Sequence, residues 1–381
     1  MRHLLYALGL AVTLCSCASA PWFKYGSNTA NNGRASDSNA TGIVAWTFDS
    51  GGPIASNPVL DSNGTVYITS TTSAGVGSLR AVDNAGNGLW SFNVSSPMRG
   101  TPGVEDGRVF VGSDDHNAYG VDAKTGNMLW HFTTGDRIVA APVPAGGSVY
   151  IASLDGKLYA LDPATGVEQW RYSTDAQFQT APAMSPDGTL YICGSDRKVY
   201  AINAATHNLV WMFQAGGNLT GAPAVGVINQ TVYVGSDDGL LHALNPVTGN
   251  DTAPWPFNAG TGGSWATPSV IYLGANKEVV YAVKRRTLVA LDALSATVLW
   301  RDPAWFAGYD YTSQPAVVPN GLLFLSTGST ASGSSLVAVN STNGAQIWKW
   351  YGGFELLDWP AVGIDGKVYV TSFNGKLTAL K

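Results

Sequence analysis

The fold is decided by the stretch VYIASLDGKLYALDPATG, residues Val149 to Gly166. Two short apolar runs flank the pair Asp155-Gly156, and Asp-Gly between such runs is a strong hairpin signal because Gly supplies the positive φ of a tight turn. The second run ends in a Thr-Gly turn, and Trp170 follows four residues later. The stretch therefore predicts two antiparallel strands, with a third strand around the Trp.

The same order of strands and turns recurs along the chain. A Trp marks each unit, at positions 46, 90, 130, 170, 211, 255, 300 and 348. A Pro follows each Trp, at positions 58, 102, 142, 182, 223, 268, 315 and 360, and in six of the eight cases the separation is twelve residues. Intervals of 40 to 48 residues with four short strands per unit are typical of propeller blades. The sequence predicts an all-β fold, an eight-bladed β-propeller of four-stranded antiparallel blades.

The two ends of the chain complete this count. The last unit begins at Trp359 and stops after its third strand, residues 376–380, without a Trp strand. The missing strand is available at residues 43–48, which contain Trp46. Pairing these segments removes two strand edges that would otherwise invite aggregation. We expect the N-terminal strand to complete the C-terminal blade and close the ring, and we expect the ring to be monomeric.

Composition excludes some classes of partner. Charged residues make up only 12% of the chain, the net charge is −5, and the few Lys and Arg are scattered. A protein that binds a nucleic-acid backbone needs a basic field, which this chain lacks. We therefore expect no nucleic-acid partner, and contact with a membrane only through a lipid anchor.

The N-terminus has the layout of an export signal. Arg2 is followed by an apolar stretch from Leu4 to Leu14 and then by small residues, and this stretch is too short to span a bilayer. Two cleavage patterns compete within residues 1–20. A lipobox would place a lipid on Cys17, whereas cleavage after Ala20 would release a soluble protein. We expect residues 21–40 to be a linker and residues 41–381 to form the propeller.

The chemically reactive residues have structural explanations. Cys193 lies in an apolar run, which predicts a buried strand residue. The acidic pairs Asp114-Asp115 and Asp237-Asp238 occupy one repeat position in hairpin turns, where turn chemistry accounts for them. The five His residues show neither a triad motif nor metal-ligand spacing. We expect no catalytic residues and no metal site.

The repeated segment, as at residues 149–166, resembles the PQQ-enzyme-type repeat, and the similarity covers essentially the whole mature chain. This family has two branches of interest. Resemblance to the quinoprotein dehydrogenases would imply bound pyrroloquinoline quinone, Ca²⁺ and an Asp base. Resemblance to BamB, an outer-membrane lipoprotein closest to this chain in size and layout, would imply a scaffold in β-barrel assembly.

Both branches have features that this chain lacks. The dehydrogenases commonly carry a vicinal Cys-Cys disulfide and long insertions. The BamB scaffold contacts its partner through a Leu- and Arg-bearing loop and an acidic loop, and the corresponding residues 176–179 and 218–220 lack those charges. We expect a non-catalytic cell-envelope scaffold without a cofactor, which binds an envelope protein or peptide. The alternative is a quinone-binding oxidoreductase or sensor with Ca²⁺.

A site is expected where the chain enters each innermost strand, because these loops surround one mouth of the channel. The longest of them, residues 302–313, is rich in aromatic side chains. Exposed aromatics beside carboxylates can hold a peptide or a flat ligand. The predicted interaction mouth comprises Arg99, Arg137, Phe178, Trp265, Tyr309, Asp310, Tyr311, Asp358 and Trp359.

We expect an exported protein. With lipid on Cys17 it would be an outer-membrane lipoprotein facing the periplasm, and with cleavage after Ala20 it would be secreted or periplasmic.

Overall fold

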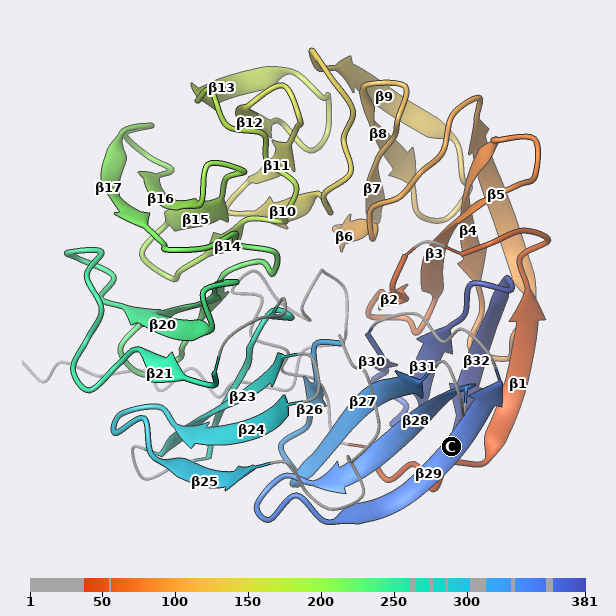
Figure 1. The fold of residues 1–381 in the computed structure, drawn as a ribbon. Helices are drawn as coiled ribbons and strands as arrows, with labels where there is room; N and C mark the ends of the chain where they lie inside the picture. Colours follow the sequence, from red (N-terminus) through yellow and green to blue (C-terminus); the bar gives the residue numbers. More distant parts are fainter. Residues whose placement is uncertain are drawn as a thin grey trace, which may run out of the picture.

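The computed structural model describes residues 38–54, 56–260, 265–273, 277–284, 287–301, 313–329, 333–353 and 359–381. These residues form eight four-stranded antiparallel sheets, arranged as blades around a ring (Figure 1). The predicted eight-bladed propeller is confirmed. No helix that could cross a membrane occurs in this part of the chain. The predicted signal and most of the linker lie outside the described residues.

The first four blades follow the order of the chain. Their strands are β2 (Val59–Leu60), β3 (Val66–Thr71), β4 (Gly77–Val82) and β5 (Gly88–Val94) in blade 1; β6 (Gly103–Glu105), β7 (Arg108–Gly112), β8 (Asn117–Asp122) and β9 (Met128–Thr133) in blade 2; β10 (Val143–Ala145), β11 (Ser148–Ala152), β12 (Lys157–Leu161) and β13 (Glu168–Ser173) in blade 3; and β14 (Ala183–Met184), β15 (Thr189–Cys193), β16 (Lys198–Asn203) and β17 (Leu209–Gln214) in blade 4.

The remaining blades continue the same order until the last one. Their strands are β18 (Ala224–Val225), β19 (Val232–Gly235), β20 (Leu240–Leu244) and β21 (Phe257–Asn258) in blade 5; β22 (Ser269–Tyr272), β23 (Glu278–Lys284), β24 (Thr287–Asp292) and β25 (Val298–Arg301) in blade 6; β26 (Ala316–Val317), β27 (Leu322–Ser329), β28 (Gly333–Asn340) and β29 (Gln346–Gly353) in blade 7; and β30 (Ala361–Val362), β31 (Val368–Thr371), β32 (Lys376–Leu380) and β1 (Val44–Asp49) in blade 8.

Blade 8 confirms the predicted closure. β1 pairs antiparallel with β32, with Trp46 opposite Ala379 and Phe48 opposite Leu377 (Figure 1). The three residues before Thr41, which we assigned to the linker, already contact the ring. The Ser38 hydroxyl donates a 2.5 Å hydrogen bond to the Gly366 carbonyl, and Ala40 is buried. Ring closure therefore begins at Ser38.

The repeated Trp residues join neighbouring blades, as predicted. Seven of them donate the indole N–H to a carbonyl in the turn between the third and fourth strands of the next blade, at 2.7 to 3.0 Å: Trp46 to Asn84, Trp90 to Ala123, Trp130 to Pro163, Trp211 to Pro246, Trp255 to Ala293, Trp300 to Ser341 and Trp348 to Ala40. Gly166 shows why this turn carries Gly. Its φ is +71°, and a Cβ there would lie 2.6 Å from the Trp130 ring.

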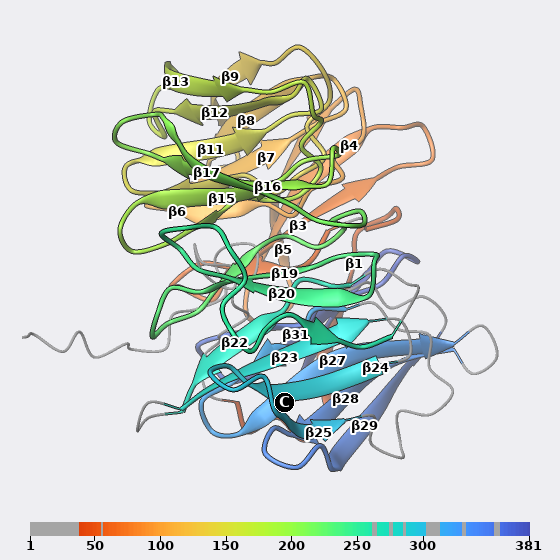
Figure 2. The same ribbon diagram turned by 60° about the vertical axis from the view of Figure 1, so that its left-hand side comes forward.

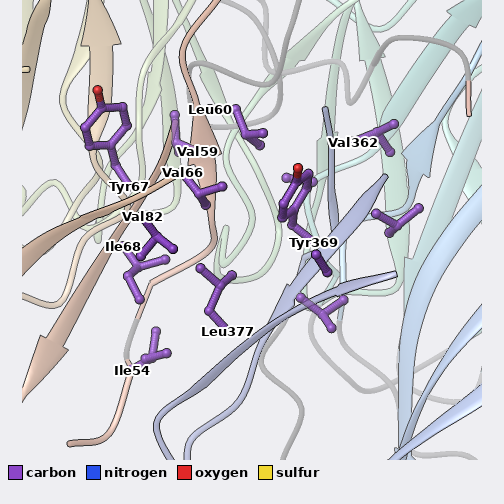
Figure 3. Packing of buried hydrophobic residues seen from close by; sticks show 14 of the residues in the cluster. Ile54, Val59, Leu60, Val66, Tyr67, Ile68, Val82, Val362, Tyr369 and Leu377 are labelled. Atoms are coloured by element: carbon purple, nitrogen blue, oxygen red, sulfur yellow. The ribbon is translucent and has the colours of Figure 1, made fainter. Parts of the chain in front are cut away.

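The core lies between the faces of the blades. Figure 2 shows the strands of neighbouring blades stacked as layers, so each blade buries its faces against the next. Figure 3 shows this packing where blade 8 meets blade 1, with Val362, Tyr369 and Leu377 facing Leu60 and Val66. In the inner strands apolar residues do not alternate with polar ones, because both faces of each strand are buried. This explains the continuous apolar runs of the sequence.

Candidate functional site

The two faces of the ring are built from different connections. One face carries the turns between second and third strands and the loops that lead from each fourth strand into the next blade; we call these loops the mouth loops. The opposite face, which we call the turn face, carries the turns between first and second and between third and fourth strands. The predicted interaction mouth belongs to the mouth loops.

A buried apolar side chain recurs in every mouth loop that the structure describes ahead of blades 1 to 6. It lies four residues before the Pro in five loops and three before it in the sixth: Ile54, Met98, Ile138, Phe178, Leu219 and Trp265, all at most 8% exposed. The residue packs between two blades; a Cβ on Gly112 would lie 2.2 Å from the Ile138 side chain. The sequence signal for this position is an apolar residue three or four residues before each Pro.

This packing corrects the expected aromatic mouth. Phe178 is 0% exposed, Trp265 is 2% exposed and Trp359 is 8% exposed. Phe178 contacts Tyr200 edge-on at 5.9 Å between ring centroids, and Trp265 fills the space that the missing side chain of Gly235 leaves. These three side chains are therefore not exposed at the mouth as we expected, because burial is the more favourable state for a large apolar ring.

Four further predicted residues, Tyr309, Asp310, Tyr311 and Asp358, lie outside the described residues. Arg99 and Arg137 are described, and both are exposed. Their side chains are 55% and 49% accessible, respectively. Among the predicted mouth residues that the structure describes, Arg99 and Arg137 are the ones exposed to solvent.

The exposed positions of the mouth loops form a polar rim on blades 2 to 5. Exposure alternates with burial along each loop, because successive side chains of an extended segment point to opposite sides. We call Arg99, Arg137, Gln177, Gln179, Asn218 and Thr220 the mouth rim; all six are exposed. Two carboxylates lie in the same loops, the exposed Asp175 and Asp136, whose Oδ1 is 3.9 Å from Arg137 Nε.

Asp114 anchors one arginine of the mouth rim. The Arg99 Nε donates a 2.7 Å hydrogen bond to Asp114 Oδ2, and the Asp114 side chain is only 11% exposed. The other carboxylate oxygen, Oδ1, is buried and has no hydrogen-bond partner among the described residues. In blade 5 the same repeat position holds Asp237, whose Oδ1 is likewise buried without such a partner. Turn chemistry therefore does not account for the first Asp of each acidic pair.

The second Asp of each pair is explained by the turn, as predicted. Asp115 accepts hydrogen bonds from the Asn117 amide at 2.9 Å and from the Tyr119 hydroxyl at 2.7 Å. Asp238 accepts from the amides of Leu240 and Gly216, both at 3.0 Å. Both carboxylates are used locally by the protein itself.

In the corresponding turn of blade 3, hydrogen bonds of this kind shift the pKa values of an Asp and a Tyr. Burial disfavours the charged form of Asp155, but hydrogen bonds from Tyr159, Gly135 and Lys157 outweigh this and hold the pKa of that carboxyl below its usual value. Burial and the same carboxylate raise the pKa of the Tyr159 hydroxyl. The pair is a structural device, with the Tyr protonated and the Asp ionised at neutral pH.

Below the mouth rim, the residues directly before each Pro connect neighbouring inner strands. The Asn57 side-chain amide donates to Thr101 Oγ1 at 3.2 Å, and the Trp359 amide donates to Asn57 Oδ1 at 3.0 Å. On the far side of the ring, the Ala222 amide donates to Thr267 Oγ1 at 2.9 Å. These bonds fix the inner ring, so the mouth rim stands on a rigid support.

The described His and Cys residues give no catalytic constellation. His242 is buried, and its Nδ1 lies 2.9 Å from Asp251 Oδ2, a pair that the sequence did not suggest. The other ring nitrogen, Nε2, has no hydrogen-bond partner among the described residues, so no hydroxyl or thiol completes a triad. Cys193 is 2% exposed, as predicted, and burial raises the pKa of its thiol.

The fold and its sequence repeats define the class of protein: an eight-bladed propeller built from PQQ-like repeats. The sequence pattern of the outer membrane protein assembly factor BamB matches residues 31–141 and 133–350. The chain therefore belongs to the BamB family. No curated protein matches it in sequence.

Solved structures of two kinds share the fold. BamB from Moraxella catarrhalis is similar with a TM-score of 0.66 and 19% identity, over 89% of this chain and 97% of that one. Quinohemoprotein alcohol dehydrogenases from Comamonas testosteroni and Pseudomonas putida are similar with TM-scores of 0.71 and 0.74 and identities of 14% and 15%. Each match to a dehydrogenase covers 95% of this chain and 80% of that one. At these identities the likeness concerns the fold alone.

The described residues do not fit the quinone and metal of the dehydrogenase branch. A hard cation needs several oxygen ligands that converge on one point. The carboxylates nearest the mouth diverge instead: Asp114 pairs with Arg99, and Asp155 and Asp238 bind backbone amides of their own turns. No group of three or more metal-ligating side chains occurs in the described part of the chain. Trp265, in the mouth loop that leads into blade 6, is buried against Gly235.

Proposed function

We propose that this protein is a non-catalytic scaffold of the cell envelope, which contributes to outer-membrane protein assembly by holding a partner protein at its mouth rim. The observation that carries this proposal is the contrast at the mouth. The large aromatics of the described loops are buried, while Arg99 and Arg137 stand exposed on a ring whose inner strands are fixed by hydrogen bonds. Membership of the BamB family supports the same function.

The rim indicates the chemistry of the partner. Arg99 makes its ion pair with Asp114 through Nε, so the two terminal nitrogens of its guanidinium take no part in that pair, and the side chain is 55% exposed. Guanidinium groups bind carboxylates in a bidentate manner, and arginines are frequent among the residues that dominate binding energy. The neighbouring glutamines and Asn218 add neutral hydrogen-bond donors and acceptors. We infer a partner surface that presents Asp or Glu side chains.

A complementation experiment tests the scaffold. In cells that lack the protein, the double variant Arg99→Ala and Arg137→Ala should fail to restore the abundance of outer-membrane β-barrel proteins, because losing two arginine contacts of about 1–2 kcal/mol each weakens binding more than tenfold. The matched control is Arg171→Ala, since the Arg171 side chain is 50% exposed on the outer strand β13. Full restoration by the double variant would refute the mouth rim as the binding site.

The alternative quinoprotein function is tested separately. Purified protein is titrated with pyrroloquinoline quinone in the presence of Ca²⁺, and absorbance and dye reduction are followed. Saturable binding with dye reduction would overturn the scaffold. We expect neither, because Asp115 and Asp238 already accept hydrogen bonds from their own turns and Asp114 pairs with Arg99.

We propose further that the scaffold is held at the outer membrane by a lipid on Cys17, with a soluble periplasmic form as the alternative if cleavage follows Ala20. A Cys17→Ala variant should move from the membrane fraction to the soluble fraction. Unchanged retention of this variant in the membrane fraction would refute lipidation at Cys17.

A further inference from the structure

Exposed apolar side chains of the turn face are concentrated on one half of the ring, although Val167 of blade 3 on the other half is also 63% exposed. Val247 and Leu294 occupy the tips of the turns between third and fourth strands in blades 5 and 6, and they are 77% and 74% exposed. The turns of blades 5, 6 and 8 carry further exposed apolar side chains, 37% to 59% exposed: Ile228, Tyr272, Leu273, Ile364 and Ile43. Of the described residues on the mouth face, only Phe373 is a comparably exposed large hydrophobic residue.

Charge divides the turn face along the same line. The turns of blades 1 to 4 carry seven acidic residues, Asp61, Asp83, Glu105, Asp106, Asp122, Asp162 and Asp187, against two basic ones, Arg108 and Lys124. The turns of blades 5 to 8 that the structure describes carry three acidic residues, Asp251, Asp292 and Asp365, against three basic ones, Lys277, Lys367 and Lys381. One half of the turn face is therefore acidic, and the other half is neutral and apolar.

The chain enters the ring on the neutral half. Ser38 lies between blades 7 and 8, where its hydroxyl donates to the Gly366 carbonyl and its own carbonyl accepts a 2.6 Å hydrogen bond from the Asn320 side-chain amide. Both partners belong to turns between first and second strands, so Ser38 is part of the turn face. Thirty-seven residues precede it in the sequence, and Cys17 lies among them.

We propose that the neutral half of the turn face docks on the surface of the lipid bilayer, with the side chains of Val247 and Leu294 inserted among the headgroups. This inference rests on the proposed envelope location and on the proposed anchor at Cys17. The bilayer is the occupant that the observations favour. Apolar tips enter the interface between headgroups and acyl chains, and the acidic half is repelled by anionic lipids.

The anchor makes such weak contacts effective. The twenty residues between Cys17 and Ser38 limit the distance between the lipid and the ring to roughly 70 Å, the reach of a chain of that length at full extension. The ring is then held close to the bilayer, and its contact with lipid becomes an intramolecular event at high effective concentration. The position of Ser38 directs the neutral half, rather than the mouth rim, toward the membrane. The mouth rim then faces away from the bilayer, toward the periplasmic partner.

Amide hydrogen exchange on vesicles tests this orientation. The exported chain beginning at Cys17 is coupled through that thiol to a maleimide lipid in vesicles of phosphatidylethanolamine and phosphatidylglycerol. Cys193 does not compete, because it is buried. Exchange in residues 245–249 and 292–297 should slow by about tenfold on vesicles. Exchange in the equivalent turn of blade 3, residues 162–167, should stay unchanged.

Two variants complete the test. The double variant Val247→Asp and Leu294→Asp should abolish the protection, and both sites are exposed enough to keep the fold. The matched control Val167→Asp alters a turn tip of blade 3 that is 63% exposed and should leave the protection intact. Equal protection in all three turns, no protection in any, or protection only in native membranes that contain proteins would overturn the proposal. Because the thiol coupling supplies the anchor and no partner is present, the result is independent of lipidation in cells and of binding at the mouth rim.

Discussion

Blade 3 and blade 8 have the same architecture but different connectivity. In blade 3 the turn between the third and fourth strands is continuous, and the Asp162 amide donates to the Val167 carbonyl at 2.8 Å. In blade 8 the turn is divided between the two ends of the described chain, and the Lys381 amide donates to the Ile43 carbonyl at the same 2.8 Å. Gly42 has a φ of +83° and lies under Trp348, as Gly166 lies under Trp130. The comparison shows that backbone bonds and Trp packing maintain this turn without chain continuity.

Removing the N-terminal half of this divided turn should have the largest effect. A chain that lacks residues 38–49 has no partner for β32 and no turn for Trp348, so an open strand edge and an apolar blade face are exposed. We expect loss of the folded monomer and formation of soluble aggregates, measured by size-exclusion chromatography and circular dichroism. A monomer with cooperative unfolding would show that closure by β1 is dispensable.

Valine at the two turn glycines should give the next largest effect. A Cβ on Gly166 would lie 2.6 Å from the Trp130 ring, and one on Gly42 would lie 2.8 Å from the Trp348 ring. The left-handed backbone adds strain for a β-branched residue, so each variant should lose roughly 3 kcal/mol of unfolding free energy. Urea unfolding measures both losses. If Gly42→Val leaves the unfolding free energy almost unchanged while Gly166→Val lowers it, the divided turn of blade 8 can rearrange around the new side chain and the continuous turn of blade 3 cannot.

The smallest effect concerns pH. Because the pKa of Asp155 is lowered on folding, its hydrogen bond with Tyr159 stabilises the protein above the unfolded-state pKa, and this contribution disappears as pH falls through the lower folded-state value. Tyr159→Phe should therefore cost about 1–2 kcal/mol at pH 7 and progressively less below about pH 4. Denaturant unfolding at several pH values measures this change.

Blade 8 provides the matched control for pH. At the positions of Asp155 and Tyr159 it has Asn374 and Thr378, and the Thr378 hydroxyl lies 3.3 Å from that of Thr47. Neither side chain titrates in this range, so Thr378→Val should give a smaller loss that is the same at every pH. A loss from Tyr159→Phe that does not change between pH 7 and pH 3 would refute the role of the ionised Asp155.

The fold was predictable because the repeated residues each serve strand formation, a turn or packing within a short stretch of chain. Trp, Pro and the Asp-Gly and Thr-Gly turns recur at fixed distances, and each can be explained within one blade or one pair of blades. The pairing of residues 43–48 with 376–380 was also predictable, because a count of strands leaves one missing and one unpaired. The site was less predictable. Arg99 and Arg137 are exposed as expected, but a mouth loop does not reveal which of its alternating side chains points inward.

The sequence by itself determined the number of blades, the closing strand and the role of the repeated Trp, because strand period and turn chemistry act over a few residues. Only the tertiary structure decided that Phe178, Trp265 and Trp359 are buried. Phe178 packs against Tyr200, and Trp265 fills the space beside Gly235 of the preceding blade. It also decided that Asp114 pairs with Arg99, fifteen residues away, and that His242 pairs with Asp251. Burial and pairing depend on which surfaces meet when the ring closes, and no local pattern records that.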